Sequence, residues 1–373
     1  MKNILLTAIA ALLFPLNAAA IQLFTFYAPC ELGLIDTFTD TSTAFGSLGE
    51  WSVEAMDYGP DGLLYATVEN GCHVHGNANI LATIDPTTLA VYPIGPTGWY
   101  DVDALAFSPS GELFGVSSSS VELITIDPDT GAGTWSTALT GLPDTFLGAI
   151  EFLPDGTLMG IDMLDAGGGP SNLYTIDIGT GAMSLVGPLV SETEIFGSVE
   201  GMTVASGPFR ALLALANSME GDENALLIRV NETTGESWVV QDMPLPLPDY
   251  PGQRDALVAL PAIEVEIDIK PGSWPNSINL RQQGVITVAV LSTDEFDAPS
   301  LNRGRFGPAR ATIVHNSGHI EDVNLDGLPD LVLHFDTGES GIQCGDESAE
   351  LRATNEVGHT VVGTDAVRTV ACK

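Results

Sequence analysis

A pattern of short apolar segments and turn residues recurs four times between residues 51 and 243, and this repetition restricts the fold more than any other feature. Each copy begins with an apolar segment, turns at proline and glycine, and continues into a second apolar segment. The turn prolines are Pro60, Pro109, Pro154 and Pro208, so the period is 45 to 54 residues. Self-similarity at such a period indicates an array of small structural units.

Each copy continues with a third apolar segment that ends in a polar turn, as at Ile84-Asp85 and Ile126-Asp127. A Thr-Gly turn and a fourth segment follow, as at Thr130-Gly131 and Thr180-Gly181. Four strands per unit, joined by such turns, are typical of the blades of a β-propeller. The Pro-Asp-Gly and Ile-Asp-x-x-Thr-Gly turns resemble those of a broad class of extracellular propellers. This resemblance implies a fold but no particular activity.

The two ends of the repeat region predict how the ring closes. Asp255 to Pro261 matches the first segment of the second copy, Asp103 to Pro109. Upstream of the first copy, Leu34 to Asp36 and Thr41 to Gly49 have the pattern of a third and a fourth strand. One blade built from both ends of the region would remove the free sheet edges. We therefore expect a propeller of about five blades over residues 21–262.

From Glu264 onward the pattern changes to that of a β-sandwich. Val265 to Ile269, Val285 to Leu291 and Leu331 to Phe335 alternate or run apolar, and no helical period occurs among them. Residues 263–373 are therefore predicted to form a second β domain, so that the whole chain is all-β.

Several strings of this second domain resemble a recurrent C-terminal module of secreted environmental bacterial proteins. They are Ile267 to Ser273, Pro275 to Asn279, Phe306-Gly307-Pro308, His315 to His319 and Thr337 to Cys344. The resemblance implies an accessory, calcium-stabilised surface or secretion domain rather than a known chemistry.

The segment from residue 322 to residue 330 has the spacing of a calcium loop. Oxygen-bearing side chains occupy positions 1, 3, 5 and 9, and a glycine, Gly327, occupies position 6. The predicted Ca²⁺ ligands are the side chains of Asp322, Asn324, Asp326 and Asp330 and the backbone carbonyl of Leu328. Position 12 is Leu333 rather than Glu, and the flanks read as strands, so an EF-hand is excluded. The loop resembles those of integrin-type extracellular β domains; the alternative is a solvated turn.

Residues 1–20 have the features of a secretory signal. Lys2 is followed by the apolar run Ile4 to Leu16 and by an A-x-A cleavage site at Ala18 to Ala20. The run is too short to span a bilayer, and no second long apolar run occurs. We expect an exported protein without a membrane span, secreted, periplasmic or held at the cell surface.

Four cysteines remain after this signal, and three pairings of them are possible. Cys344 and Cys372 lie closest together in the sequence, which favours their pairing and leaves Cys30 with Cys72. Two disulfides suit an oxidising compartment. The alternative is that the thiols are free and buried.

The charge balance is strongly acidic, with 49 acidic and 12 basic residues and a net charge of −37. Most of the excess, a net −29, falls within residues 21–262. Because such a field repels phosphate backbones, it excludes nucleic-acid binding and favours divalent cations or a salty medium.

Three weaker signals concern possible sites. His73 and His75 have strand spacing for a transition metal, but flanking glycines favour a loop. His315 and His319 have the spacing of zinc ligands on a helix, which the intervening residues would break. Carboxylates recur at the start of the predicted first strands, except in the third copy, which has Gly148; they could ring the channel or simply face water. They are Glu54, Asp103, Glu200 and Asp255.

The sequence contains no G-x-S-x-G, S-x-x-K or H-E-x-x-H motif. We therefore expect an exported, monomeric, non-catalytic binding or scaffolding protein with a calcium-stabilised module. Its extracellular ligand would be a protein, a polysaccharide or a small molecule. The alternative is a hydrolase or lyase that uses acidic residues at the channel.

Overall fold

The computed structural model describes residues 21–372 except for 28–29, 38–39, 73–77, 142–145, 164–168, 192, 206–210, 219–224, 244–253, 282–283, 315–317 and 356–359. Within these ranges the regular elements are strands and a single 3₁₀ turn at Ala298–Ser300, so the predicted all-β class is confirmed. No helix in the described part of the chain is long and apolar enough to cross a membrane. The predicted signal, residues 1–20, lies outside the described residues.

Twenty strands form five antiparallel sheets of four strands each, the blades of a propeller. The first blade is β20 (Arg254–Ala259), β1 (Gln22–Tyr27), β2 (Glu31–Asp36) and β3 (Thr41–Ser47). The second is β4 (Trp51–Tyr58), β5 (Leu64–Asn70), β6 (Ala78–Ile84) and β7 (Val91–Tyr100). The third is β8 (Val102–Phe107), β9 (Leu113–Ser117), β10 (Glu122–Ile126) and β11 (Gly133–Ala138). The fourth is β12 (Phe146–Phe152), β13 (Leu158–Met163), β14 (Asn172–Ile176) and β15 (Met183–Pro188). The fifth is β16 (Phe196–Ala205), β17 (Ala211–Ser218), β18 (Ala225–Val230) and β19 (Ser237–Met243).

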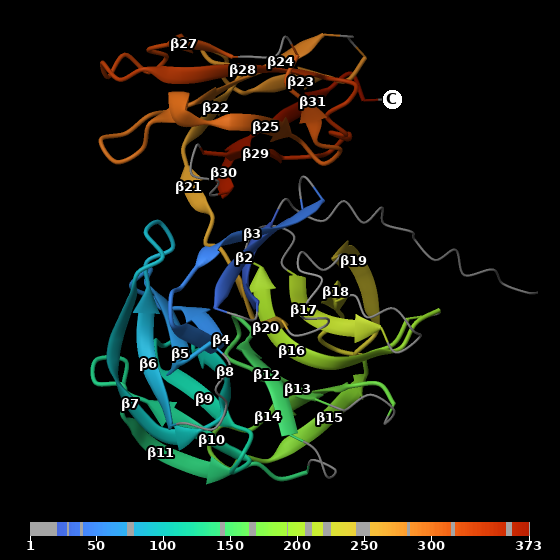
Figure 1. The fold of residues 1–373 in the computed structure, drawn as a ribbon. Coiled ribbons are helices and arrows are strands. Elements are labelled where there is room, and N and C mark those ends of the chain that lie inside the picture. Colours follow the sequence, from blue (N-terminus) through green and yellow to red (C-terminus); the bar gives the residue numbers. More distant parts are fainter. Residues whose placement is uncertain are drawn as a thin grey trace, which may run out of the picture.

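The ring closes as predicted, through a blade shared between the two ends of the propeller (Figure 1). Strand β20 pairs with β1 in antiparallel register, with Leu23 opposite Ala259 and Phe24 opposite Val258. The innermost strands contact one another around the ring in the order β20, β4, β8, β12, β16 and back to β20. Sequence analysis missed β1 itself, since Gln22–Tyr27 follows directly on the predicted signal without a turn motif.

The propeller core lies between neighbouring blades rather than at the centre. Buried apolar side chains form one cluster at each of the five blade boundaries. At one boundary the rings of Phe114 and Phe152 lie 5.4 Å apart. At the closing boundary Leu23 and Ile35 pack with Leu213 and Leu227 of the fifth blade. Each blade therefore buries its apolar faces only when both neighbours are present.

The polar turn between the third and fourth strands of the third blade lies directly against the second blade. Asp127 Oδ1 accepts hydrogen bonds from the N–H groups of Asp129 (2.9 Å) and Thr130 (3.3 Å), which shapes the turn. Gly131 then adopts φ = +77°, and a Cβ there would lie 2.4 Å from the carbonyl oxygen of Gly95 in the second blade. Glycine is required here both by the backbone angle and by this close approach.

The remaining strands form the C-terminal module, whose β21 leads on from the propeller (Figure 1). One sheet contains β21 (Ile263–Val265), β30 (Thr360–Ala366), β29 (Ser348–Thr354), β25 (Asn302–Phe306) and β26 (Ala311–Thr312). The other contains β22 (Ile267–Ile269), β24 (Val285–Val290), β28 (Asp330–Asp336) and β27 (His319–Glu321). A two-stranded pair, β23 (Ser277–Asn279) and β31 (Arg368–Val370), completes the module.

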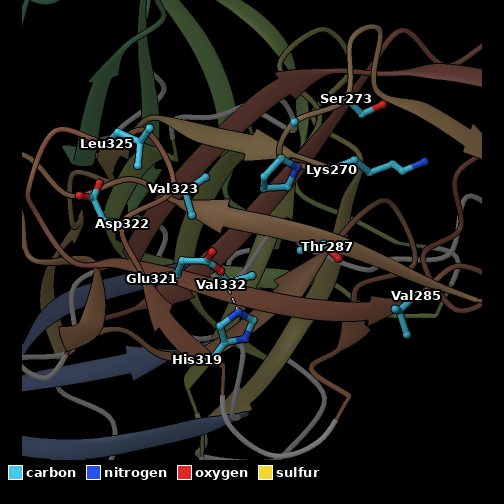
Figure 2. A pocket seen from close by; sticks show the side chains of 12 residues that line it. Lys270, Ser273, Val285, Thr287, His319, Glu321, Asp322, Val323, Leu325 and Val332 are labelled. Atoms are coloured by element: carbon cyan, nitrogen blue, oxygen red, sulfur yellow. Dashed lines mark hydrogen bonds and ion pairs between the residues drawn. The ribbon is translucent and has the colours of Figure 1, made fainter.

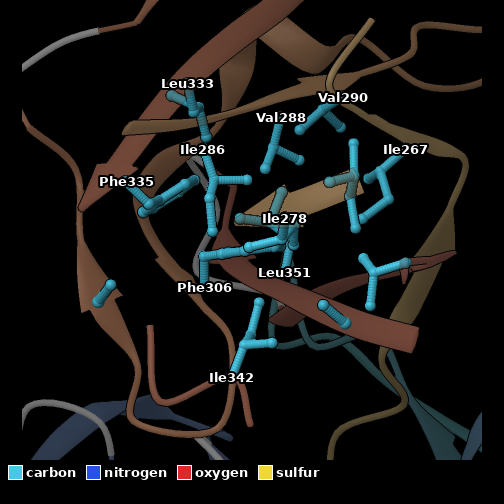
Figure 3. Packing of buried hydrophobic residues seen from close by; sticks show 14 of the residues in the cluster. Ile267, Ile278, Ile286, Val288, Val290, Phe306, Leu333, Phe335, Ile342 and Leu351 are labelled. Atoms are coloured by element: carbon cyan, nitrogen blue, oxygen red, sulfur yellow. The ribbon is translucent and has the colours of Figure 1, made fainter. Parts of the chain in front are cut away.

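Apolar side chains from these two sheets meet in one core (Figure 3). Ile286 and Leu333 come from one sheet and Leu351 from the other. Phe306 and Phe335 stack across the core with ring centroids 5.2 Å apart. The predicted β-sandwich is confirmed.

Both disulfides pair as the sequence favoured. Cys30–Cys72 joins the first blade to the second and closes a loop of 42 residues. Cys344–Cys372 ties the C-terminal end to the segment before β29, over 28 residues. Loops of this length give each bridge a stabilising effect of roughly 3 to 4 kcal/mol through the unfolded state.

Candidate functional site

The predicted calcium loop connects β27 to β28 at the surface of the C-terminal module. It curls tightly because Leu325 and Gly327 both adopt left-handed backbone angles, φ = +62° and +92°. Asp322 lies at the centre of the curl: its Oδ1 accepts from the N–H of Asp326 and its Oδ2 from that of Gly327, both at 3.1 Å. The loop backbone thus wraps around one carboxylate.

Three of the predicted ligand side chains share this curl. Asn324 Oδ1 accepts from the N–H of Asp326 at 3.1 Å, and Asn324 Nδ2 donates to Asp326 Oδ2 at 2.9 Å. Asp326 Oδ1 also accepts from the N–H of Leu328 at 2.8 Å. A carboxylate oxygen that accepts one hydrogen bond keeps a second lone pair, so Asp322, Asn324 and Asp326 can still offer oxygens to a hard cation. Oxygen donors of this kind are those that Ca²⁺ prefers.

The fourth predicted side chain, Asp330, has a different environment. It is fully buried at the start of β28. Its Oδ1 accepts from the N–H of Ser292 and its Oδ2 from that of Val323, both at 2.8 Å. Asp330 therefore fastens the base of the loop to the segment after β24. Calcium ligation by all five predicted groups, Asp330 and the Leu328 carbonyl included, stays a prediction.

A groove with a cavity of about 540 Å³ lies beside the loop (Figure 2). Its lining comes from three places in the chain: the turn after β22, the outward faces of β24 and β28, and β27 with the first half of the loop. The apolar part includes Val285, Val323, Leu325 and Val332, and the polar part includes Lys270, Thr287, His319, Glu321 and Asp322. This volume is within the usual range of small-ligand sites.

The polar side chains in and around the groove interact with one another. His319 Nε2 lies 3.4 Å from Glu321 Oε2, and the His319 ring stacks on that of His334 at 5.5 Å. His334 Nδ1 in turn lies 3.2 Å from Thr287 Oγ1. Lys270 Nζ donates to the carbonyl of Ser277 at 2.5 Å. These contacts hold hydrogen-bonding groups at fixed places along the groove.

The propeller channel offers much less room. Small and apolar side chains from all five inner strands line a cavity of about 10 Å³, which holds no more than about one water. Asp103, one of the predicted ring of carboxylates, lies among these lining residues. Glu54 is half-buried on β4, whereas the side chains of Glu200 and Asp255 lie outside the described residues.

Two other carboxylates of the inner strands were missed by sequence analysis. Burial raises the pKa of Asp57, on β4, to about 7. Burial, and then the charge of Asp57, raises the pKa of Glu151, on β12, well above its ordinary value. Both side chains keep partial contact with water, but protein atoms crowd their carboxyl groups. The two occupy the same position of the repeat, which an alignment of the copies could have revealed.

Of the two histidine pairs singled out in the sequence, only His319 lies among the described residues. His73, His75 and His315 lie outside the described residues. His319 lines the groove on β27, a strand rather than a helix. Among the described residues no cluster of three His, Cys, Asp or Glu side chains has metal-binding geometry.

No protein-family model matches the sequence, and no curated protein matches it. Similar solved structures include a nidogen/laminin complex, with 11% identity, a TM-score of 0.42, and coverage of 65% of this chain and 98% of that one. A protein of unknown function from Bacteroides caccae has 11% identity, a TM-score of 0.42, and coverage of 65% and 99%. TolB from Acinetobacter baumannii has 13% identity, a TM-score of 0.37, and coverage of 65% and 67%.

Proposed function

We propose that this chain is an exported binding protein whose C-terminal module is stabilised by calcium and carries the ligand site. The observation that supports this most is the groove of about 540 Å³, which shares Asp322 with the acidic loop. In this proposal the propeller acts as a scaffold, because its inner strands line a cavity of only about 10 Å³. The two disulfides are compatible with an extracellular or periplasmic location.

Calcium would bind the oxygens of Asp322, Asn324 and Asp326, with Asp330 and the Leu328 carbonyl completing the shell. Asp322 and Asp326 lie within one short turn, where their charges repel each other without a cation. A cation that binds only the folded loop stabilises the module by linkage.

The test is the melting temperature of the mature chain, residues 21–373, with calcium and with EDTA. Calcium should raise the transition of the C-terminal module, and Asp326→Ala should remove that increase. Equal melting temperatures in both conditions would refute the calcium site.

A second candidate function is hydrolysis or elimination by acidic residues of the inner strands. The raised pKa values of Asp57 and Glu151 support it, because a carboxyl group that is protonated near neutral pH can serve as a general acid. The assay is release of new reducing ends from polysaccharides by the wild type and by Glu151→Gln. Equal or absent release would remove this candidate.

A further inference from the structure

Two strongly exposed apolar side chains of the C-terminal module lie together in the groove. Among the described residues after Glu264, four large hydrophobic side chains are strongly exposed: Trp274 (84%), Val285 (51%), Ile320 (63%) and Leu325 (85%). Val285 and Leu325 line the groove, whereas Trp274 and Ile320 are not among its lining residues. Apolar surface that gathers at one place on a soluble protein usually marks a binding site.

The hydrogen-bonding groups of the groove are mixed in kind. Thr287 has a hydroxyl that both donates and accepts, and the His319 and Glu321 pair adds a ring nitrogen and a carboxylate. On the opposite wall, Lys270 already donates its ammonium to the carbonyl of Ser277. The groove therefore offers donors and acceptors along an apolar surface rather than a concentrated positive charge.

We infer that the groove binds a neutral oligosaccharide. A sugar chain presents flat C–H faces, which suit exposed aliphatic side chains, and hydroxyl edges that each donate and accept hydrogen bonds. The net charge of −37 disfavours acidic polysaccharides. This inference rests on the proposed function, since it names the ligand class of the same module.

The groove and the acidic loop share a wall. Asp322, Val323 and Leu325 contribute to the groove, and Asp322 is also at the centre of the loop. Calcium that orders the loop would order this wall as well. Sugar affinity should therefore fall when EDTA removes calcium, while the wall formed by His319 and Glu321 remains.

The experiment titrates the mature chain with cellohexaose, laminarihexaose, xylohexaose and mannohexaose, by calorimetry and tryptophan fluorescence in calcium. At least one neutral hexasaccharide should bind. Val285→Trp, which fills the groove, should weaken that binding at least about tenfold. Ser348→Trp, on an exposed position of β29, adds the same side chain elsewhere in the module and should leave affinity unchanged.

Thr287→Val is the second variant, because it keeps the shape of the side chain and removes only the hydroxyl; it should also weaken binding. Absence of binding by all four hexasaccharides would overturn the inference, as would binding that neither groove variant weakens. Competition for the groove by polygalacturonate or by a lysine-rich peptide instead of the neutral sugars would overturn it as well. Calcium-dependent melting is measured separately, so failure of the sugar inference and failure of the calcium site are distinguishable.

Discussion

Asp57 Oδ2 accepts a hydrogen bond from the backbone N–H of Phe107 at 2.6 Å, across the boundary between the second and third blades. The same position of the repeat makes the same kind of contact at two other boundaries. Glu151 accepts from the N–H of Val204, and Thr203 Oγ1 accepts from the N–H of Ala259 at 3.1 Å. A polar side chain of one inner strand thus fastens the next inner strand at three of the boundaries.

These carboxylates should make stability depend on pH. The folded-state pKa of Asp57 is raised to about 7, and that of Glu151 is also raised, from unfolded values near 4. Between about pH 4 and 7 the folded state binds more protons, so the free energy of unfolding falls as pH rises through that window. Glu151→Gln removes the charge beside Asp57 and should therefore reduce this fall.

The measurement is the urea midpoint of wild type and Glu151→Gln at about pH 5 and about pH 8. The variant should gain relative stability at the higher pH only. Because other acidic residues also titrate, the test compares the change in urea midpoint between the two pH values in the wild type with that in the variant. Parallel pH profiles would contradict a coupled pair.

Gly131→Ala should loosen the contact between the second and third blades. The new Cβ would lie 2.4 Å from the Gly95 carbonyl oxygen, and the φ of +77° is itself unfavourable for alanine. We expect a loss of roughly 3 kcal/mol in the free energy of unfolding. Gly62→Ala is the matched control: its φ is +80° with open space around the Cβ, so it should lose only about 1 kcal/mol. Equal losses would mean that the contact with Gly95 is unimportant.

Removal of residues 21–50 should abolish folding of the propeller. The deleted segment contains β1, β2 and β3, and therefore all of the first blade except β20. Leu23 and Phe24 are almost fully buried, so their loss opens two blade boundaries at once. Circular dichroism and limited proteolysis should detect an unfolded or protease-sensitive chain. A cooperative, protease-resistant product would show that the shared blade is dispensable.

Much of the fold could be predicted because its determinants are local and repeated. Turn residues such as Pro60 and Gly131 mark the same positions in successive blades, and the apolar segment at Asp255 repeats that at Asp103. Tertiary contacts were not predictable in this way. Sequence analysis emphasised carboxylates such as Glu54 and Asp103. The pair with raised pKa values, Asp57 and Glu151, occupies the repeat position three residues further along.

In the candidate site, too, contacts between residues close in sequence were predictable and contacts between distant residues were not. Asp322, Asn324 and Asp326 are close in sequence and share one turn, as their spacing predicted. The environment of Asp330 depends on Ser292, which lies 38 residues away. No pattern in the sequence around Asp330 predicts this contact. The groove likewise combines segments separated by many residues, so it becomes visible only in the folded module.

Asp330 and Asp326 should therefore respond differently to the same substitution. In Asp330→Asn an amide NH₂ replaces one carboxylate oxygen, so the N–H of either Ser292 or Val323 faces a donor in a buried place. We expect a loss of about 2 kcal/mol in the free energy of unfolding with or without calcium. Asp326 is exposed, so Asp326→Asn should reduce only the stabilisation that calcium adds. Urea unfolding of both variants in calcium and in EDTA separates the two effects. If Asp330→Asn lost stability in calcium alone, Asp330 would contribute only as a calcium ligand and not as the anchor of the loop.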